Sequence, residues 1–439
     1  MNYDKVAPKK YQVYTAKNFK KIKQLECVPD DVLTSVDVVS KVFAFKTNNY
    51  VVDELINWEK VPDDPIFRLV FPQKGMLSDH EYSHMKSLVM NSASPGSIRA
   101  NVASIHKRMN PHPAGQMELN VPESTGIRGL SGVQHKYDET VLFFPSQGQT
   151  CHAFCTYCFR WPQFSGLDNY RFASKNVDAL IRYIEMHPEI TDLLITGGDP
   201  LVMSAKVLEQ YIDPVLKSSP GNLSTIRIGT KVPAYWPYRF LTDNDSDDLM
   251  RLFSRIAESG YHLALMAHYT HYRELETPAA EAAVKRLRQA GAVIRSQSPV
   301  VRHINDNPEV WSRMWEIQAG LGVIPYYMFV QRNTGPRSYF SLPLKQAYDI
   351  FTESYKGVSG LKRTVRGPSM SAAPGKVLVE GITGIRGEKY FVLKFIQARN
   401  PEWVNRIFFA EYDERACWLD ELTPAFGEQE FFFDLRDAA

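Results

Sequence analysis

Short apolar runs alternate with amphipathic segments through the middle of the chain. Runs with the length and composition of buried strands lie at 140–146, 192–196, 225–229, 262–269, 292–301 and 323–331. Between them, apolar residues recur at helical spacing in the segments 177–187, 205–217, 246–259, 278–290 and 308–320. Strands that alternate with helices in this way predict an α/β fold with a parallel sheet and right-handed crossovers, either an open doubly wound sheet or an incomplete barrel.

Polar and chemically unusual residues fall where these strands are expected to end. Parallel strands present their carboxyl ends at one edge of the sheet, and proteins of this architecture hold their active sites there. In chain order the strands are followed, or closed, by three cysteines, Gly197-Gly198-Asp199, Thr230-Lys231, His268 and His271, Gln297 and Arg302, and Arg332. The sequence therefore predicts an active site along this edge.

The composition sets limits on partners and compartment. The 439 residues carry a formal net charge of +2 and are 44% hydrophobic, which gives no electrostatic reason to expect nucleic acid or an acidic membrane surface as a partner. Residues 1–23 are polar and charged, and no run approaches the ~18 apolar residues of a membrane span. Five cysteines, three of them clustered, do not suit a secreted disulfide framework. We therefore expect a cytoplasmic protein.

The clustered cysteines lie in CHAFCTYCFRW, residues 151–161, with the spacing Cx3Cx2C. A structural zinc site usually has four ligands, so His152 or a remote residue would have to complete it. Three buried, unreactive thiols are a second possibility. The third is a [4Fe–4S] cluster held by three thiolates, which leaves one iron open to another ligand. Cys27 and Cys417 stand apart, and we interpret Cys27 as a buried structural thiol.

With Tyr157 before its last cysteine, this spacing resembles the signature of the radical S-adenosylmethionine (SAM) enzymes. A wider set of motifs is similar, in order and spacing, to the lysine 2,3-aminomutase family: HKYDETVLFF, CHAFCTYCFR, LLITGGDPL, IRIGTKVPAYWPYR, AHYTHYREL, IRSQSPVVRHIND and IPYYMFVQ. ELINWEKVPDDPIFRLVFP, residues 54–72, resembles the leader segment of that family. The resemblance spans roughly residues 40–380.

The resemblance implies an incomplete (β/α)6 TIM-like radical SAM barrel at 131–335. We expect a mainly helical N-terminal extension at 1–130. At 336–439 we expect a C-terminal segment that binds pyridoxal 5′-phosphate (PLP) and ends in an aromatic, acidic tail, which covers the barrel or makes an oligomer contact. The three cysteines, Cys151, Cys155 and Cys158, are implied to hold a [4Fe–4S] cluster whose open iron binds SAM. The implied SAM contacts are Tyr157, Gly197, Gly198, Asp199, His268 and Gln297.

The family also uses PLP, which needs a lysine to hold its aldehyde. Lys376, in RGPSMSAAPGKVLV, matches the family lysine that follows the last barrel strand. Lys136 and Tyr137 match an Arg-Tyr pair near the PLP phosphate and ring, although a lysine serves an anion only as a point charge. A further family arginine is Thr140 here, so we expect an altered phosphate site.

The resemblance likewise implies the substrate contacts. Arg160 matches the residue that pairs with the substrate α-carboxylate, an ion pair that is charge-assisted and often bidentate. Lysine-using members hold the distant ammonium with two aspartates, which correspond to Arg332 and Ser369 in this chain. A cation there would repel lysine and suit a carboxylate, and glutamate-using members also carry a basic residue at this position. Alternatively, Arg332 turns outward or pairs with an acid such as Glu353.

These matches imply an isomerase, a PLP-dependent radical SAM 2,3-aminomutase that moves the α-amino group of an acidic amino acid, such as L-glutamate, to C3. The expected partners are the substrate, an electron donor such as flavodoxin or ferredoxin, and further copies of the chain, without nucleic acid or membrane. The family's zinc-binding cysteines are missing around Cys417, so no structural zinc is expected. Three alternatives remain open: a lysine aminomutase with a relocated ammonium site, a PLP-free radical SAM enzyme that modifies peptides, and a non-catalytic iron–sulfur or zinc-binding module.

Overall fold

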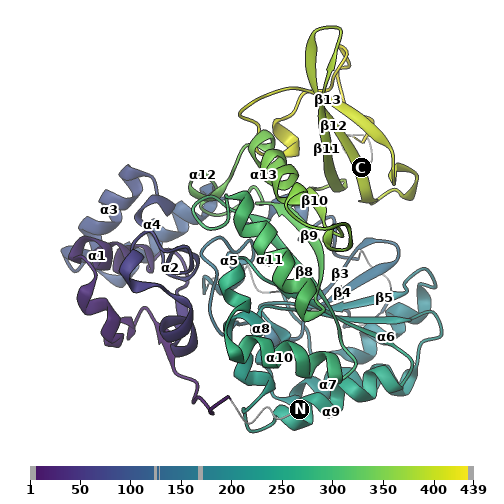
Figure 1. Cartoon of the computed structure of the whole chain (residues 1–439), viewed down its shortest axis with the longest axis horizontal. Coiled ribbons are helices and arrows are strands. Elements are labelled where there is room, and N and C mark those ends of the chain that lie inside the picture. Colours follow the sequence, from purple (N-terminus) through teal and green to yellow (C-terminus); the bar gives the residue numbers. More distant parts are fainter. Residues whose placement is uncertain (1–5, 123–125, 128, 167–171, 434–439) are drawn as a thin grey trace.

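One large mixed sheet organises the protein. The computed structural model describes residues 6–122, 126–127, 129–166 and 172–433. Within these ranges eleven strands form one sheet in the order β13-β12-β11-β10-β9-β8-β7-β6-β5-β4-β3 (Figure 1). The strands are β3 (Val133–Tyr137), β4 (Thr140–Phe143), β5 (Asp192–Ile195), β6 (Thr225–Thr230), β7 (His262–His268), β8 (Val293–Val300), β9 (Ile324–Val330), β10 (Arg366–Ser371), β11 (Gly375–Ile385), β12 (Glu388–Ala398) and β13 (Ile407–Glu411).

The strands from β4 to β9 pair in parallel, each with the next along the chain, and correspond to the six predicted strands. The five predicted helices are present as α6 (Val177–Met186), α7 (Ala205–Ser218), α9 (Ser246–Glu258), α10 (Pro278–Gln289) and α11 (Pro308–Leu321). Side chains cap the first turn of several of these helices. Ser204 Oγ accepts a hydrogen bond from Val207 N, and Thr277 Oγ1 accepts one from Ala280 N. The predicted α/β fold is confirmed, whereas the description as a six-unit partial barrel stays a prediction.

The two ends of the strand order approach each other, because β12 and the turn before β11 contact residues in and near β3. Gln397 Nε2, on β12, donates to Glu139 Oε1 at 2.6 Å, and Glu139 lies in the turn between β3 and β4. Arg399 Nη1 donates to Leu119 O at 2.7 Å, and Lys136 on β3 donates to Ala372 O. The turn before β11 therefore lies against β3, which brings Lys376 beside Tyr137.

The N-terminal residues form helices and one small sheet that pack on the central unit (Figure 1). The elements are β1 (Val13–Thr15), α1 (Asp30–Val39), β2 (Lys46–Asn48), α2 (Pro65–Val70), α3 (Asp79–Met90) and α4 (Pro95–Arg108). Their buried apolar side chains, such as Phe67 and Ile105, belong to the same core as those of the parallel strands. Cys27 is exposed, because it ends a short 3-10 helix at the surface, so the interpretation of a buried thiol was wrong.

The C-terminal residues extend the sheet and have a core of their own. β10 pairs in parallel with β9, and β11, β12 and β13 then follow with antiparallel pairing, although no strands were predicted after residue 331. The described tail packs on this extension, with Phe433 against Phe395 and Phe408, rather than closing the parallel strands. The remaining helices are α5 (Trp161–Phe164), α8 (Val232–Tyr235), α12 (Arg337–Phe340) and α13 (Leu344–Lys356). None of the helices described is both long and apolar enough to cross a bilayer.

Candidate active site

The three clustered cysteines lie on the loop between β4 and α5, at the carboxyl end of the parallel strands. Cys158 N donates to Cys155 O at 3.1 Å, which folds the loop back on itself, and Cys155 Sγ lies 3.0 Å from the Tyr235 hydroxyl. Burial raises the pKa of all three thiols, that of Cys158 to about 12. Because thiolates in such a place need positive charge beside them, the donor set fits a bound iron–sulfur cluster.

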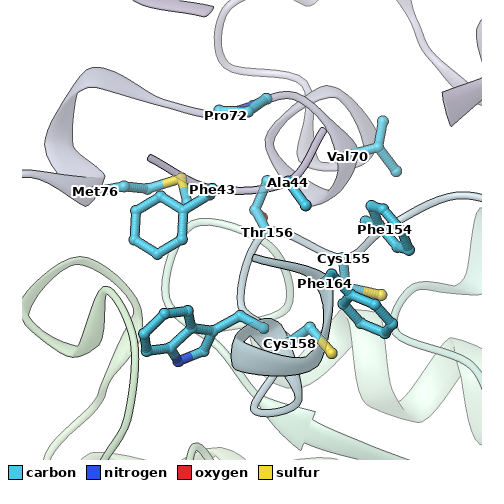
Figure 2. A pocket seen from close by; sticks show the side chains of 11 residues that line it. Phe43, Ala44, Val70, Pro72, Met76, Phe154, Cys155, Thr156, Cys158 and Phe164 are labelled. Carbon is cyan, nitrogen blue, oxygen red and sulfur yellow. The ribbon is translucent and has the colours of Figure 1, made fainter. Parts of the chain in front are cut away.

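A pocket of about 360 Å³, its open mouth included, lies on the outer side of this loop. Figure 2 shows that Phe43 and Met76 line it on one side, while the sulfur atoms of Cys155 and Cys158 point away from them. The rings of Phe154 and Phe164, which also line it, stack at 4.5 Å. Among the described residues, no three His, Cys, Asp or Glu side chains are arranged to hold a single metal ion.

The glycine turn after β5 lies directly against the cysteine loop. Gly197 has a φ of +150°, and a Cβ on Gly198 would come within 2.5 Å of Thr150 N, so both positions require glycine. Asp199 is buried and accepts hydrogen bonds from Leu201 N, Thr230 Oγ1 and Lys231 N. Burial raises the pKa of Asp199 to about 6. Its carboxylate thus joins the turn to β6, while Gly197 and Gly198 let the turn pack closely against Gln149 and Thr150 of the cysteine loop.

Three other predicted SAM contacts lie close together on the same edge. The Tyr157 hydroxyl lies 3.2 Å from His268 Nε2 and 2.6 Å from Thr270 Oγ1. Gln297 on β8 is the register partner of His268 on β7. Burial lowers the pKa of His268 well below its ordinary value, so the imidazole is neutral at pH 7. The structure therefore brings Tyr157, His268 and Gln297 beside the cysteine loop.

Lys376, the second residue of β11, lies inside an aromatic cage. Its Nζ lies 4.3 Å from the centre of the Tyr327 ring and 5.8 Å from those of Tyr137 and Phe329, and it donates to Gln397 Oε1 at 2.7 Å. Burial lowers the pKa of Lys376 to about 8. An amine of lowered pKa among aromatic rings suits a planar aldehyde cofactor such as PLP.

The residues predicted around PLP lie next to this cage. Lys136 Nζ donates to Ala372 O, so in this structure it holds the turn that precedes Lys376. The Tyr137 hydroxyl is buried, lies near Ser371, and has no hydrogen-bond partner of normal geometry among the described residues. Thr140, where an arginine was expected from the family, accepts from Arg227 Nη2 at 3.3 Å.

Arg160 and Arg332 lie in the same space between the cysteine loop and β10. Both guanidinium groups lie over the Phe159 ring, at 5.0 Å and 4.3 Å, and burial lowers the pKa of each to about 10. Arg332 Nη2 donates to Ser371 Oγ at 3.0 Å. Ser369 is fully buried, and its hydroxyl lies 3.5 Å from Met328 O.

The alternative in which Arg332 pairs with Glu353 does not hold. Glu353 instead pairs with Lys356 at 2.7 Å. Among the described ion pairs, none joins a carboxylate to Arg160 or Arg332. Both guanidinium groups therefore remain available to an anionic ligand.

Known proteins with similar sequences decide the family. A protein of Aquifex aeolicus (strain VF5) described as "Putative L-lysine 2,3-aminomutase" is 31% identical over 407 residues, which cover 93% of this chain and 95% of that protein. The L-lysine 2,3-aminomutase of Bacillus subtilis (strain 168) is 32% identical over 233 residues, which cover 53% of this chain and 45% of that enzyme. This chain belongs to the lysine 2,3-aminomutase family.

Two further comparisons add little to this assignment. No family model matches the chain. A radical SAM methyltransferase from Sphaerobacter thermophilus has 15% identity and a TM-score of 0.38, covering 53% of this chain and 68% of that one, which is too weak a likeness to bear on the fold.

Two arginines of this aminomutase-family site were not predicted from the sequence. Arg227 lies beside Thr140 and is held by Asp192 at 2.7 Å, and it lowers the pKa of Lys376 in addition to the larger effect of burial. Arg399 Nε donates to Ala373 O at 2.8 Å, in the turn before Lys376. Arg227 is a charged residue within β6 and Arg399 follows the end of β12. Both placements are common, so no local signal marked either arginine.

Proposed function

We propose that this chain is a PLP-dependent radical SAM 2,3-aminomutase whose substrate is an acidic amino acid such as L-glutamate. The cluster is assigned to the three cysteines, SAM to the glycine turn with Tyr157, His268 and Gln297, and PLP to Lys376 with Tyr137. When bound, these groups supply a carbon-centred radical that abstracts hydrogen and an electron sink that carries the migrating nitrogen. The electron that starts the reaction is assigned to a donor protein such as a flavodoxin or ferredoxin.

The observation that carries the substrate assignment is the pair of half-buried cations, Arg160 and Arg332, over one phenylalanine ring. Arg160 is assigned to the α-carboxylate, which its planar guanidinium can bind through two hydrogen bonds. Arg332 is assigned to the side-chain carboxylate at the other end of the substrate. Because neither has a carboxylate partner among the described ion pairs, an anionic ligand would meet cations that have already lost much of their hydration.

The remaining side chains hold the substrate and exclude water. Ser371 fixes the guanidinium of Arg332, and Phe159 forms a flat wall beneath it. Tyr327 and Phe329 shield Lys376, whose depressed pKa keeps part of the amine neutral and able to return to the aldehyde after turnover. A closed site of this kind also protects a reactive radical from solvent.

A lysine 2,3-aminomutase activity is the second candidate, because the similar curated proteins carry that name. A lysine substrate would bring its side-chain ammonium close to the guanidinium of Arg332. A penalty of ~3 kcal/mol for two desolvated like charges corresponds to about a hundredfold in kcat/KM. A lysine 2,3-aminomutase activity therefore requires an acidic residue elsewhere in the site to hold the side-chain ammonium.

The deciding experiment is anaerobic turnover with reconstituted cluster, SAM, PLP and each of the twenty amino acids, with products identified by mass spectrometry. We expect glutamate or a similar acid to give a β-amino acid, with lysine at least about a hundredfold slower. The double variant Arg332→Asp with Ser369→Asp should lose glutamate turnover and begin to use lysine. Preference of the wild-type protein for lysine would overturn the acidic substrate but leave the aminomutase assignment in place. Absence of PLP-dependent chemistry, with SAM cleavage intact, would favour a PLP-free enzyme.

A further inference from the structure

The outer side of the cysteine loop is built by the N-terminal extension. Phe154 N donates to Lys46 O at 2.8 Å, and Thr156 N donates to Leu69 O at 2.9 Å. The carbonyl oxygen of His152 accepts from Asn48 Nδ2 at 3.2 Å and from the Tyr11 hydroxyl at 2.9 Å. Main-chain groups on both sides of Cys155 are thus hydrogen-bonded to residues far away in the sequence, so the extension helps to hold the loop in this shape.

Lys46 also places its charge at this loop. Its Nζ donates to Thr150 Oγ1 at 3.2 Å, and Thr150 directly precedes Cys151. The ammonium lies 5.8 Å from the centre of the Phe154 ring, in a partly buried place where burial lowers the pKa of Lys46. None of the ion pairs described gives Lys46 an acidic partner, so its charge acts on the loop without neutralisation.

The other cations around the cysteines already have partners or roles. Lys231 forms a buried ion pair with Glu274 at 2.6 Å, with side chains 7% and 0% exposed, so its charge is largely cancelled. Arg160 is assigned to the substrate carboxylate above. Lys46 is a cation at the loop that has no carboxylate partner in the described ion pairs and no role in the proposed reaction.

We propose that Lys46 is a positioning residue for the cluster, and that its ammonium stabilises the reduced form. A cubane with three thiolates is anionic and gains one more negative charge on reduction. A fixed cation in a partly desolvated place favours that extra charge, which raises the midpoint potential. This inference rests on the proposed function only in requiring that the three cysteines hold a cluster.

The test is a potentiometric titration of the reconstituted full-length protein, followed by electron paramagnetic resonance, with iron content measured on every sample. Lys46→Gln removes the charge but can keep a hydrogen bond to Thr150, whereas Lys46→Arg keeps the charge. We expect Lys46→Gln to lower the equilibrium constant for one-electron reduction about tenfold, or ~59 mV, and Lys46→Arg to stay near the wild-type value. Lys41→Met is the matched control, because it removes a lysine of the same extension whose ammonium pairs with Asp37 at 3.1 Å.

The outcomes separate a structural role from an electrostatic one. Full iron content with an unchanged potential in Lys46→Gln would overturn the inference, and so would an equal shift in Lys41→Met. If Lys46→Gln takes up little iron, the titration is repeated with Lys46→Met. A partial iron content does not prevent this comparison, because each potential is measured only on the protein that carries the cluster. A wild-type protein that takes up no cluster would overturn the proposed function itself, and this inference with it.

Discussion

Lys376 is expected to capture PLP at neutral pH, where an ordinary lysine is almost fully protonated. Burial lowers its pKa to about 8, so ~9% of the amine is neutral at pH 7, against roughly one part in 2,500 for a lysine of pKa ~10.4. Since only the neutral amine attacks an aldehyde, the capture rate should rise about tenfold per pH unit below pH 8 and level off above it.

The assay uses protein freed of PLP, mixed with excess PLP at pH values from 6 to 10. Samples are quenched with borohydride after short times, and the pyridoxyl mass is located by peptide mass spectrometry. We expect half-maximal capture near pH 8 on the peptide that contains Lys376. Peptides that carry only exposed lysines give the internal control, because their labelling should still be rising at pH 10.

Lys136 is the informative competitor in this experiment. Burial also lowers its pKa well below the ordinary value, and it lies in the same space, although its Nζ donates to Ala372 O. Label on Lys136 would show that the catalytic lysine has been assigned to the wrong residue. Label on Lys376 with half-maximal capture near pH 10 would refute the argument from burial. If Lys376 is the residue that captures PLP, Lys376→Arg should abolish specific capture at every pH.

Three further expectations test other parts of the site. Substitution by alanine of any one of the clustered cysteines, Cys151, Cys155 or Cys158, should remove the iron-dependent brown colour that is measured after anaerobic reconstitution. Cys27→Ala and Cys417→Ala should leave that colour unchanged. Gly198→Ala should weaken SAM binding by at least about tenfold in equilibrium dialysis, because its Cβ would meet Thr150 N at 2.5 Å, and unchanged affinity would refute this. Arg227→Met should weaken PLP by about tenfold but pyridoxal, which has no phosphate, hardly at all, and equal losses would exclude a role at the phosphate.

The parallel strands and their helices could be predicted because their signal is local. β6 was expected at 225–229 and lies at Thr225–Thr230, and α10 was expected at 278–290 and lies at Pro278–Gln289. Buried parallel strands are apolar throughout, and the helices carry side-chain caps and one apolar face. The edge that collects functional residues follows from the parallel arrangement, which is why His268 and Gln297 were expected near the clustered cysteines, whereas Tyr157 was expected there from the resemblance.

The strands after residue 331 could not be predicted by the same means. β11 and β12 pair with each other in a long antiparallel hairpin. Their apolar positions are interrupted by Glu380, Gly381 and Lys394, so neither strand has the continuous apolar run that is typical of a buried parallel strand. Register matters as well. A shift in the pairing of β9 with β10 lies between Arg366 and Ser369, and Ser371, not Ser369, provides the hydroxyl at Arg332. Contacts of this kind depend on strand pairing, which motif positions alone do not contain.

The balance of charge around Lys376 gives an independent argument for the acidic substrate. Several cations there have no carboxylate partner among the described ion pairs, namely Lys136, Arg160, Arg332, Arg366 and Arg399. A bound phosphate brings about two negative charges and an α-carboxylate brings one, which leaves positive charge without an anion. A side-chain carboxylate would offset part of that charge, whereas the ammonium of lysine would add to it. If Arg399→Met, which lowers the positive charge without touching the place assigned to the side chain, improves lysine turnover as much as Arg332→Met does, the total charge decides specificity. If only Arg332→Met improves it, the local contact decides.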